Sequence, residues 1–259
     1  MTDFFMMLGA GLVTGFLIGL TGMGGGALMT PFLLTVMKFN PVLAVGTDLV
    51  FAAVTKVVGG VGHHHESKIS IKPVLWLAMG SVPASIVGSQ FILHQTDNHQ
   101  LIDVFLPRLL GWTLIVVSVI IIARAFRLLG PKDQTDIRYP SALALVLIGT
   151  FGGVLVGMTS IGGGTVIMAL LLLFFSMPLN HMVGLDVMHG ALLAIISAFS
   201  YIFAGQTNFS AVGILLLGSL PGVWLGAKVV QRINLLLVRG ILAVLILVVG
   251  INLLSGGWR

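Results

Sequence analysis

A glycine-rich motif occurs twice in the chain at a fixed offset, and this duplication constrains the fold more than any other feature. The sequence TGMGGG at 21–26 is matched by TSIGGG at 159–164, which lies 138 residues later. At the same offset an ungapped match runs from about residue 11 to residue 90, and it pairs Gly11 with Gly149, Asp48 with Asp186 and Pro83 with Pro221. The chain is therefore a duplicated unit with helix-breaking glycines at the same place in each copy. In a membrane, this combination is typical of a transporter.

The composition places the duplicated unit in a bilayer. Hydrophobic residues make up 57% of the 259 residues, and charged residues only 8%, whereas a soluble domain carries about a quarter charged residues. A bilayer accepts such a chain because its interior is apolar. We predict an all-α polytopic membrane protein in contact with lipid. The net charge of +5 comes from loop residues, so it does not predict binding to nucleic acid.

Eight apolar stretches are long enough to cross a bilayer, which takes about 20 residues. They cover roughly 4–22, 42–62, 73–93, 104–123, 141–160, 182–203, 210–228 and 235–254. Two shorter apolar stretches, 25–37 and 163–175, each follow a glycine triplet. We predict that these two form short broken or re-entrant helices.

Loop charges predict that the two copies are inverted. The first repeat is assigned to 1–127 and the second to 141–259, with a basic and therefore cytoplasmic linker at 128–140. The 63–72 loop contains two lysines, whereas its equivalent at 204–209 is uncharged. The charge bias also reverses at the next pair of equivalent loops. Opposite insertion of the two repeats explains this reversal and places both termini outside.

The repeated motifs resemble those of the sulfite exporter TauE/SafE family, also called the TSUP permeases. The resemblance covers nearly the whole chain, and it rests on GLTGMGGGALMTP (19–31), AVGTDL (44–49), GSVPASIVG (80–88), and the copies GMTSIGGG (157–164), VGLD (183–186) and GSLPGVWLG (218–226). It implies a permease of the bacterial inner (plasma) membrane that exports or imports small sulfur-containing anions, such as sulfite or organosulfonates.

The glycine triplets are the first candidates for a substrate site. A broken helix exposes backbone N–H groups and a partly positive N-terminus, which suit an oxyanion. The residues concerned are Gly24, Gly25, Gly26, Gly162, Gly163 and Gly164. Thr21 and Thr159 precede the triplets and could offer hydroxyl groups. The alternatives are close helix packing for the glycines and hydrogen bonds within their own helices for the threonines.

Four ionisable residues within the apolar spans are the candidates for charge handling. Asp48 and Asp186 occupy equivalent positions, and an ionised carboxylate in a membrane needs a partner, water or a proton. Each could carry a coupling proton, bind a sodium ion, or cap a helix at the interface. Lys56 lies two turns after Asp48 and could pair with it, face an anion, or extend toward the interface. His189 follows Asp186 by one turn and could share a proton with it or simply pack.

These residues favour a secondary transporter for a small anion, working by alternating access with possible proton coupling. A cation or metal permease that uses the two aspartates, an intramembrane enzyme built from Asp48, Asp186 and His189, and a structural membrane subunit are the alternatives. We predict no catalytic residues, no cofactor and no metal site. His63, His64 and His65 are consecutive, so their side chains do not converge on one ion. Homo-oligomerisation is left open.

Overall fold

The structure is a computed structural model that describes residues 2–21, 26–63, 71–125, 140–161, 165–175, 179–229 and 235–256. Within these ranges the chain forms helices and no strand. The first repeat contains α1 (Thr2–Thr21), α2 (Gly26–Thr35), α3 (Pro41–His63), α4 (Ile71–His94), and a π-helical turn η1 (Leu101–Phe105) that continues into α5 (Leu106–Ala125). The second contains α6 (Ala142–Thr159), α7 (Val166–Phe174), α8 (Leu179–Phe203), α9 (Phe209–Val229) and α10 (Leu235–Leu254).

The helix lengths confirm the predicted all-α membrane fold. Within the described residues, seven helices are long and apolar enough to cross a membrane, and α10 adds a shorter apolar stretch at Gly240–Leu254. The two segments after the glycine triplets are short, as expected: α2 has 10 residues and α7 has 9. A helix of this length covers about 15 Å, which is half of the hydrocarbon core.

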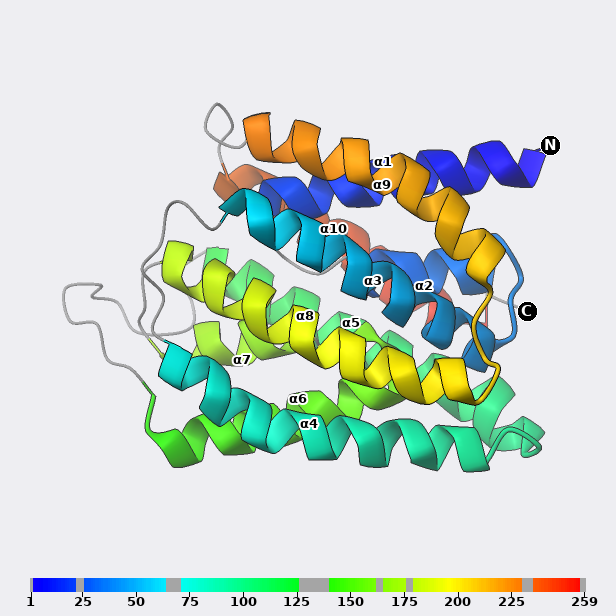
Figure 1. Cartoon of the computed structure of the whole chain (residues 1–259), viewed down its shortest axis with the longest axis horizontal. Coiled ribbons are helices and arrows are strands. Elements are labelled where there is room, and N and C mark those ends of the chain that lie inside the picture. The colour runs from blue at the N-terminus through cyan, green and yellow to red at the C-terminus, as the bar shows by residue number, and fades with distance from the viewer. Residues whose placement is uncertain are drawn as a thin grey trace.

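Equivalent helices of the two repeats run in opposite directions (Figure 1). In that view α1, α3 and α9 run from right to left, whereas their equivalents α6, α8 and α4 run from left to right. The α8–α9 connection lies at the right-hand end of the bundle, while α3 ends and α4 begins at the left-hand end. The predicted inversion of the repeats is therefore confirmed.

The closest helix packing joins one repeat to the other. α1 packs along α9, and α4 packs along α6 in the equivalent pair. A Cβ atom added at Gly15 would overlap the backbone of Ser219, and one added at Gly153 would overlap that of Ser81. Gly153 is the repeat equivalent of Gly15, and Ser81 is the repeat equivalent of Ser219. The two contacts are therefore the same contact, with the roles of the two repeats exchanged. Small residues that let helix backbones approach are the usual means of helix association in lipid.

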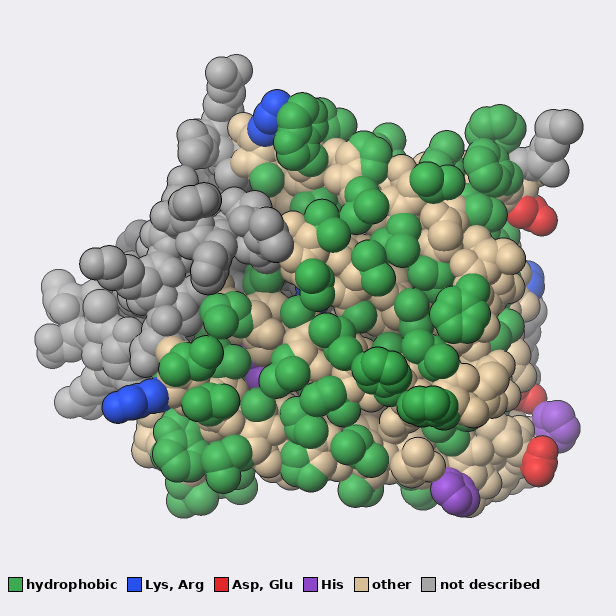
Figure 2. Space-filling view, viewed as in Figure 1, with side chains coloured by type: hydrophobic (Ala, Val, Ile, Leu, Met, Phe, Trp, Pro, Cys, Tyr) green, Lys and Arg blue, Asp and Glu red, His purple; other side chains and the backbone are tan. Residues whose placement is uncertain are grey.

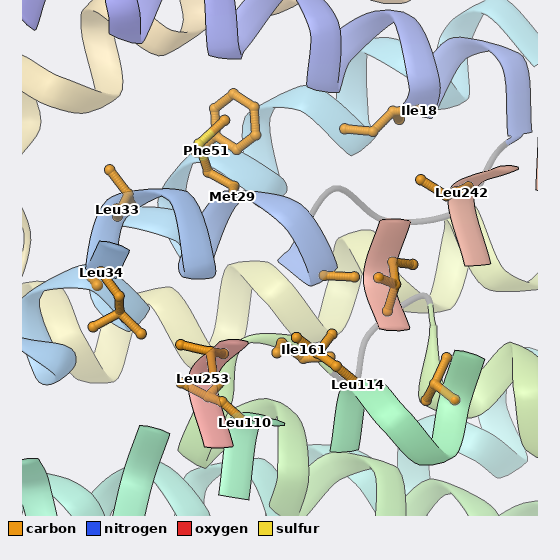
Figure 3. Close-up of a cluster of buried hydrophobic side chains, with 14 of the residues drawn as sticks. Ile18, Met29, Leu33, Leu34, Phe51, Leu110, Leu114, Ile161, Leu242 and Leu253 are labelled. Atoms are coloured by element: carbon orange, nitrogen blue, oxygen red, sulfur yellow. The ribbon is translucent and has the colours of Figure 1, made fainter. Parts of the chain in front are cut away.

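The surface and the interior are both apolar. Hydrophobic side chains cover the face shown in Figure 2, and the charged side chains drawn there lie toward the two ends of the bundle. Inside, a cluster of buried side chains joins both repeats: Met29, Leu33 and Phe51 come from the first, and Ile161 and Leu242 from the second (Figure 3). This distribution suits a protein that is surrounded by lipid and has water only at its ends.

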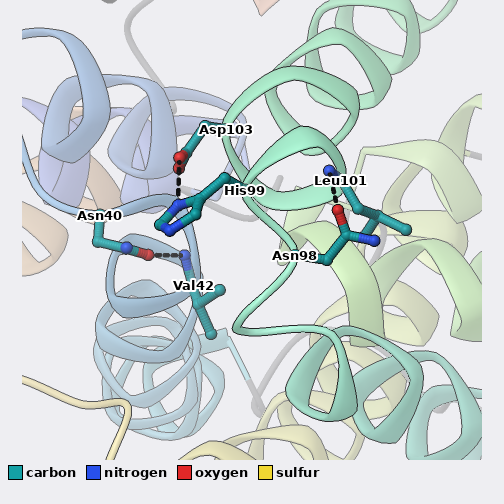
Figure 4. Close-up of polar contacts among 6 residues, drawn as sticks. All are labelled: Asn40, Val42, Asn98, His99, Leu101 and Asp103. Carbon is teal, nitrogen blue, oxygen red and sulfur yellow. Dashed lines mark hydrogen bonds and ion pairs between the residues drawn. The ribbon is translucent and has the colours of Figure 1, made fainter.

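Polar caps lie at the right-hand end of the bundle (Figures 1 and 4). Asn40 Oδ1 accepts a hydrogen bond from the backbone N–H of Val42 at the start of α3 (3.0 Å), and Asn98 does the same for the first residue of η1 (3.2 Å). His99 Nδ1 lies 3.2 Å from Asp103 Oδ2, in a pair that is largely exposed. The two asparagine side chains therefore cap the starts of α3 and η1 at the end of the bundle.

The predicted sidedness and domain boundaries stay predictions. α1 begins and α10 ends at the same end of the bundle (Figure 1), which is compatible with termini on one side of the membrane. Most of the predicted linker at 128–140 lies outside the described residues. The three consecutive histidines also fall largely outside them, because only His63 is included, as the last residue of α3.

Candidate substrate and coupling site

The four ionisable residues predicted for charge handling come from two helices that pack against each other, α3 and α8. Asp48, Asp186 and His189 are 0% exposed, and Lys56 is 3% exposed. Lys56 lies within electrostatic range of the other three side chains. The structure therefore brings together two carboxyl groups, one amine and one imidazole in the interior of a bundle whose other buried polar side chains, among the described residues, are serines and threonines.

Asp48 is held by two hydroxyl groups. Thr30, on α2, donates a hydrogen bond to Asp48 Oδ2, and Ser160, just after α6, donates to the same oxygen at 2.9 Å. The other oxygen, Oδ1, has no hydrogen-bond partner among the described residues. Because Ser160 belongs to the second repeat, this carboxyl group links the two halves of the protein. Asp48 does not cap α3, since the Asn40 side chain takes that place.

Ser160 reaches Asp48 from an unusual backbone conformation. It follows the last residue of α6 in the left-handed region, with φ 64° and ψ −16°. Residues other than glycine adopt this conformation at a cost of about 1–3 kcal/mol, and functional sites are where such residues cluster. Gly22 is the equivalent residue of the first repeat and lies outside the described residues. The second repeat thus has a hydroxyl group at this position, and the first repeat has a glycine.

Asp186 has different neighbours from Asp48. Neither of its carboxyl oxygens has a hydrogen-bond partner among the described residues. Its main compensating charge is Lys56, which reaches it from α3. The equivalent of Thr30 is Met168, which is buried but has no hydroxyl group. The two copies therefore supply the same carboxyl group with different partners.

His189 is paired with a serine on a third helix. Its Nε2 atom lies 2.7 Å from Ser81 Oγ on α4, and its Nδ1 atom has no hydrogen-bond partner among the described residues. Ser219, the counterpart of Ser81, lies 3.3 Å from the Thr55 hydroxyl oxygen instead. The residue equivalent to His189 is Phe51, so only one copy has the serine–histidine pair.

The two threonines before the glycine triplets are buried and bond to their own helices. Thr21 Oγ1 donates to the Leu17 carbonyl at 2.7 Å, and Thr159 Oγ1 donates to the Leu155 carbonyl at 2.6 Å. These bonds correspond to the alternative of local hydrogen bonding, and a substrate role for these residues stays a prediction. Gly26 is the first residue of α2. The other five triplet glycines lie outside the described residues.

Sequence reasoning missed three polar residues of the cluster: Thr30, Ser81 and Ser160. A signal was available for Ser160, because the two copies differ there: the first repeat has Gly22 at this position. Ser81 gave no such signal, since both copies carry serine at that position. Its partner on α8 became evident only from the packing of α4 against α8.

A model of the sulfite exporter TauE/SafE family matches residues 7–253 of the chain. The chain belongs to the sulfite exporter TauE/SafE family. One relative of this TauE/SafE protein is the probable membrane transporter protein YjnA of Bacillus subtilis. It is 36% identical to the chain over 247 residues, which cover 94% of the chain and 97% of the relative.

Further TauE/SafE relatives carry the same description. The probable membrane transporter protein YdhB of Bacillus subtilis is 27% identical and covers 83% of the chain and 85% of its own length. A probable membrane transporter protein of Haemophilus influenzae is also 27% identical, with 97% of this chain and 98% of the relative covered. This TauE/SafE protein is therefore a multi-pass membrane transporter of the bacterial plasma membrane, and not an enzyme.

Proposed function

We propose that the protein is a secondary transporter that moves a small sulfur oxyanion, sulfite or an organosulfonate, by alternating access coupled to protons. The observation that carries this proposal is the position of Lys56. Its side chain is 3% exposed, and it lies on α3 two turns after Asp48. Its counterpart in the second repeat is Ala194. A buried amine in a membrane is costly and marks an ion or substrate pathway, and a single cation at this depth attracts an anion.

Proton coupling follows from the charges of the cluster. Two ionised aspartates and one lysine sum to one negative charge, and an incoming anion would add a second within a medium of low dielectric constant. Protonation of one carboxyl group makes the empty cluster neutral, and protonation of both gives it one positive charge, which balances one anionic charge. Asp48 and Asp186 are the carboxyl groups that would take up these protons.

Alternating access is supported by the inverted repeats. Transporters with such repeats place their substrate site at the repeat interface, next to broken helices. Here Asp48 in the first repeat bonds to Ser160 at the α6–α7 break of the second. The choice of a sulfur oxyanion rests on the description of the family as sulfite exporters.

Flux measurements in proteoliposomes test the proposal. Uptake of sulfite, methanesulfonate and a divalent cation is compared with and without a pH gradient. We expect uptake of at least one of the two anions, and acceleration of that uptake by the gradient. Divalent cation uptake without any anion uptake would show that the protein is a cation permease instead.

Two variants test the coupling. Asp48→Asn and Asp186→Asn each remove a carboxyl group that can ionise while keeping its shape, so gradient-driven uptake should fall and counterflow exchange should persist. Asp103→Asn, which alters an exposed aspartate at the end of the bundle, is the matched control. Unchanged gradient-driven uptake in both buried variants would remove the proton-carrying role.

A further inference from the structure

Ser81 and His189 form a pair in which both side chains are completely buried, so their hydrogen bonds must be made with protein groups or with a ligand. Among the described residues, the Ser81 hydroxyl oxygen has one hydrogen-bond partner, His189 Nε2 at 2.7 Å. A serine hydroxyl has a single hydrogen to donate, and a buried donor left without an acceptor is costly. The ring N–H of His189 is a buried donor as well, and the direction of the contact depends on the tautomer of the ring. Ser81 donates to Nε2 when the ring proton lies on Nδ1, and accepts from Nε2 when the proton lies there.

Each direction corresponds to one tautomer of the imidazole ring, and the arrangement in which Ser81 donates leaves the ring N–H available to a ligand. If Nε2 accepts the hydrogen bond from Ser81, it carries no proton, and the proton of the neutral ring must lie on Nδ1. That Nδ1 atom is buried and has no hydrogen-bond partner among the described residues. In this tautomer the ring holds an N–H donor that has no acceptor among the described residues, within electrostatic range of the Lys56 amine.

From this geometry we infer that Ser81 is a positioning residue, which fixes His189 in the Nδ1–H tautomer so that this N–H donates a hydrogen bond to an oxygen of the transported oxyanion. The inference rests on the proposed function for the identity of the acceptor. Lys56 would supply the charge for the anion, and His189 a directed hydrogen bond. A neutral N–H donor adds directionality without a second positive charge beside the lysine.

The repeat supplies a matched control for Ser81. Ser219 is its counterpart, is equally buried, and lies against Gly15 as Ser81 lies against Gly153. Its hydroxyl faces Thr55 instead of a histidine. A purely structural role predicts similar consequences for Ser81→Ala and Ser219→Ala, whereas a role through His189 predicts a difference.

Transport kinetics test the inference through the separation of KM from kcat. We expect Ser81→Ala to raise the KM for methanesulfonate about tenfold, since one hydrogen bond to a charged acceptor is lost or weakened, with a much smaller change in kcat. Ser219→Ala should leave KM within about twofold. Equal effects of the two substitutions on KM would overturn the inference.

The shape of the replacement at His189 gives a second kinetic test. The amide nitrogen of asparagine falls near Nδ1, and that of glutamine falls near Nε2. His189→Asn should therefore raise the KM for methanesulfonate less than His189→Gln does, by about tenfold. The reverse order would show that Nε2 contacts the substrate, which contradicts the inference.

The tautomer can be measured independently of transport. Solid-state NMR of the protein in bilayers, with 15N-labelled histidine, distinguishes protonated from unprotonated ring nitrogens, and the signals that disappear in His189→Gln identify this ring among the seven histidines. We expect a protonated Nδ1 and an unprotonated Nε2. The opposite tautomer would overturn the role of Ser81 even if the protein transports anions.

Adding methanesulfonate to the same sample separates the two proposals. A shift of the Nδ1 signal on addition supports the contact with the oxyanion. Anion uptake in proteoliposomes without any shift of this signal would reject the contact while leaving the proposed function intact. Absence of both uptake and shift would reject the proposed function and the ligand contact, and would leave only the tautomer assignment.

Discussion

Asp48 and Asp186 are copies of one residue that have acquired different surroundings. Asp48 accepts hydrogen bonds from Thr30 and Ser160, whereas neither oxygen of Asp186 has a hydrogen-bond partner among the described residues. Asp186 instead relies on the charge of Lys56. All five side chains are at most 6% exposed, so the contrast arises from the neighbours and not from access to water.

The difference teaches that equivalent carboxyl groups of a duplicated unit can have different partners. A carboxyl group held by two hydroxyls from different helices is suited to join structural elements. One that faces a cation, with its oxygens unoccupied, is suited to exchange protons or respond to a ligand. We therefore expect Asp48 to contribute to stability as well as to coupling, and Asp186 mainly to coupling.

Removal of the cation should have the largest effect. Lys56→Met leaves two carboxyl groups without a compensating charge, and breaking a buried charge pair costs about 3–5 kcal/mol. If this cost falls on anion binding, kcat/KM for methanesulfonate should drop about a hundredfold or more. Lys228→Met removes an exposed lysine that stacks on Trp224 and is the control. Wild-type uptake by Lys56→Met would show that the cation does not serve the substrate.

The two amide variants should then differ from each other. Asp186→Asn is expected to abolish stimulation of uptake by the pH gradient, since no hydrogen-bond network restrains this carboxyl group. Asp48→Asn keeps an oxygen that can accept from Thr30 and Ser160, so about half or more of the stimulation should remain if its task is structural. The measurement is the ratio of uptake with and without the gradient. An equal loss in both variants would contradict the separation of tasks.

Substitution of Ser160 should have a smaller effect, on stability. Ser160→Ala loses the bond to Asp48 and keeps the left-handed backbone, which should cost about 2 kcal/mol. Ser160→Gly loses the same bond but relieves about 1 kcal/mol of backbone strain, so it should cost about 1 kcal/mol. Unfolding titrations in mixed micelles measure both. If glycine proved the more damaging, the left-handed conformation would not be the source of the difference.

The smallest effect is expected for the exposed aspartate. Asp103→Asn removes a pair with His99 in which the side chains are 41% and 89% exposed, and such pairs contribute less than about 0.5 kcal/mol. Neither uptake nor unfolding should change measurably. This variant defines the background against which the buried aspartates are compared, and a large effect would indicate a role for this end of the bundle.

The sequence predicted the helices well because their signal is local. Each predicted span overlaps a helix, since about 20 apolar residues in a row have only one common structure in a membrane. Inversion was also predictable, because equivalent loops differ in charge according to the side they face. Burial of Asp48, Asp186, Lys56 and His189 followed from their positions inside these spans.

The partners within the cluster were not predictable, because they depend on packing between helices. Nothing local indicates that Ser81 on α4 meets His189 on α8, or that Ser160 reaches Asp48. The comparison of the two copies came closest, since it marked Lys56 and Ser160 as positions where the repeats differ. Differences between the copies were thus better guides to the site than their identities.

Close packing between helices of different repeats has a consequence for the order in which the protein assembles during synthesis. α1 is synthesised before α9, yet the backbone that α1 packs against most closely belongs to α9. Until α9 has been translated and inserted, the glycine face of α1 is without its partner and borders on lipid or on the insertion machinery. α1 therefore reaches its final position only after α9 has entered the membrane, and a chain that ends before α9 lacks the partner of this glycine face.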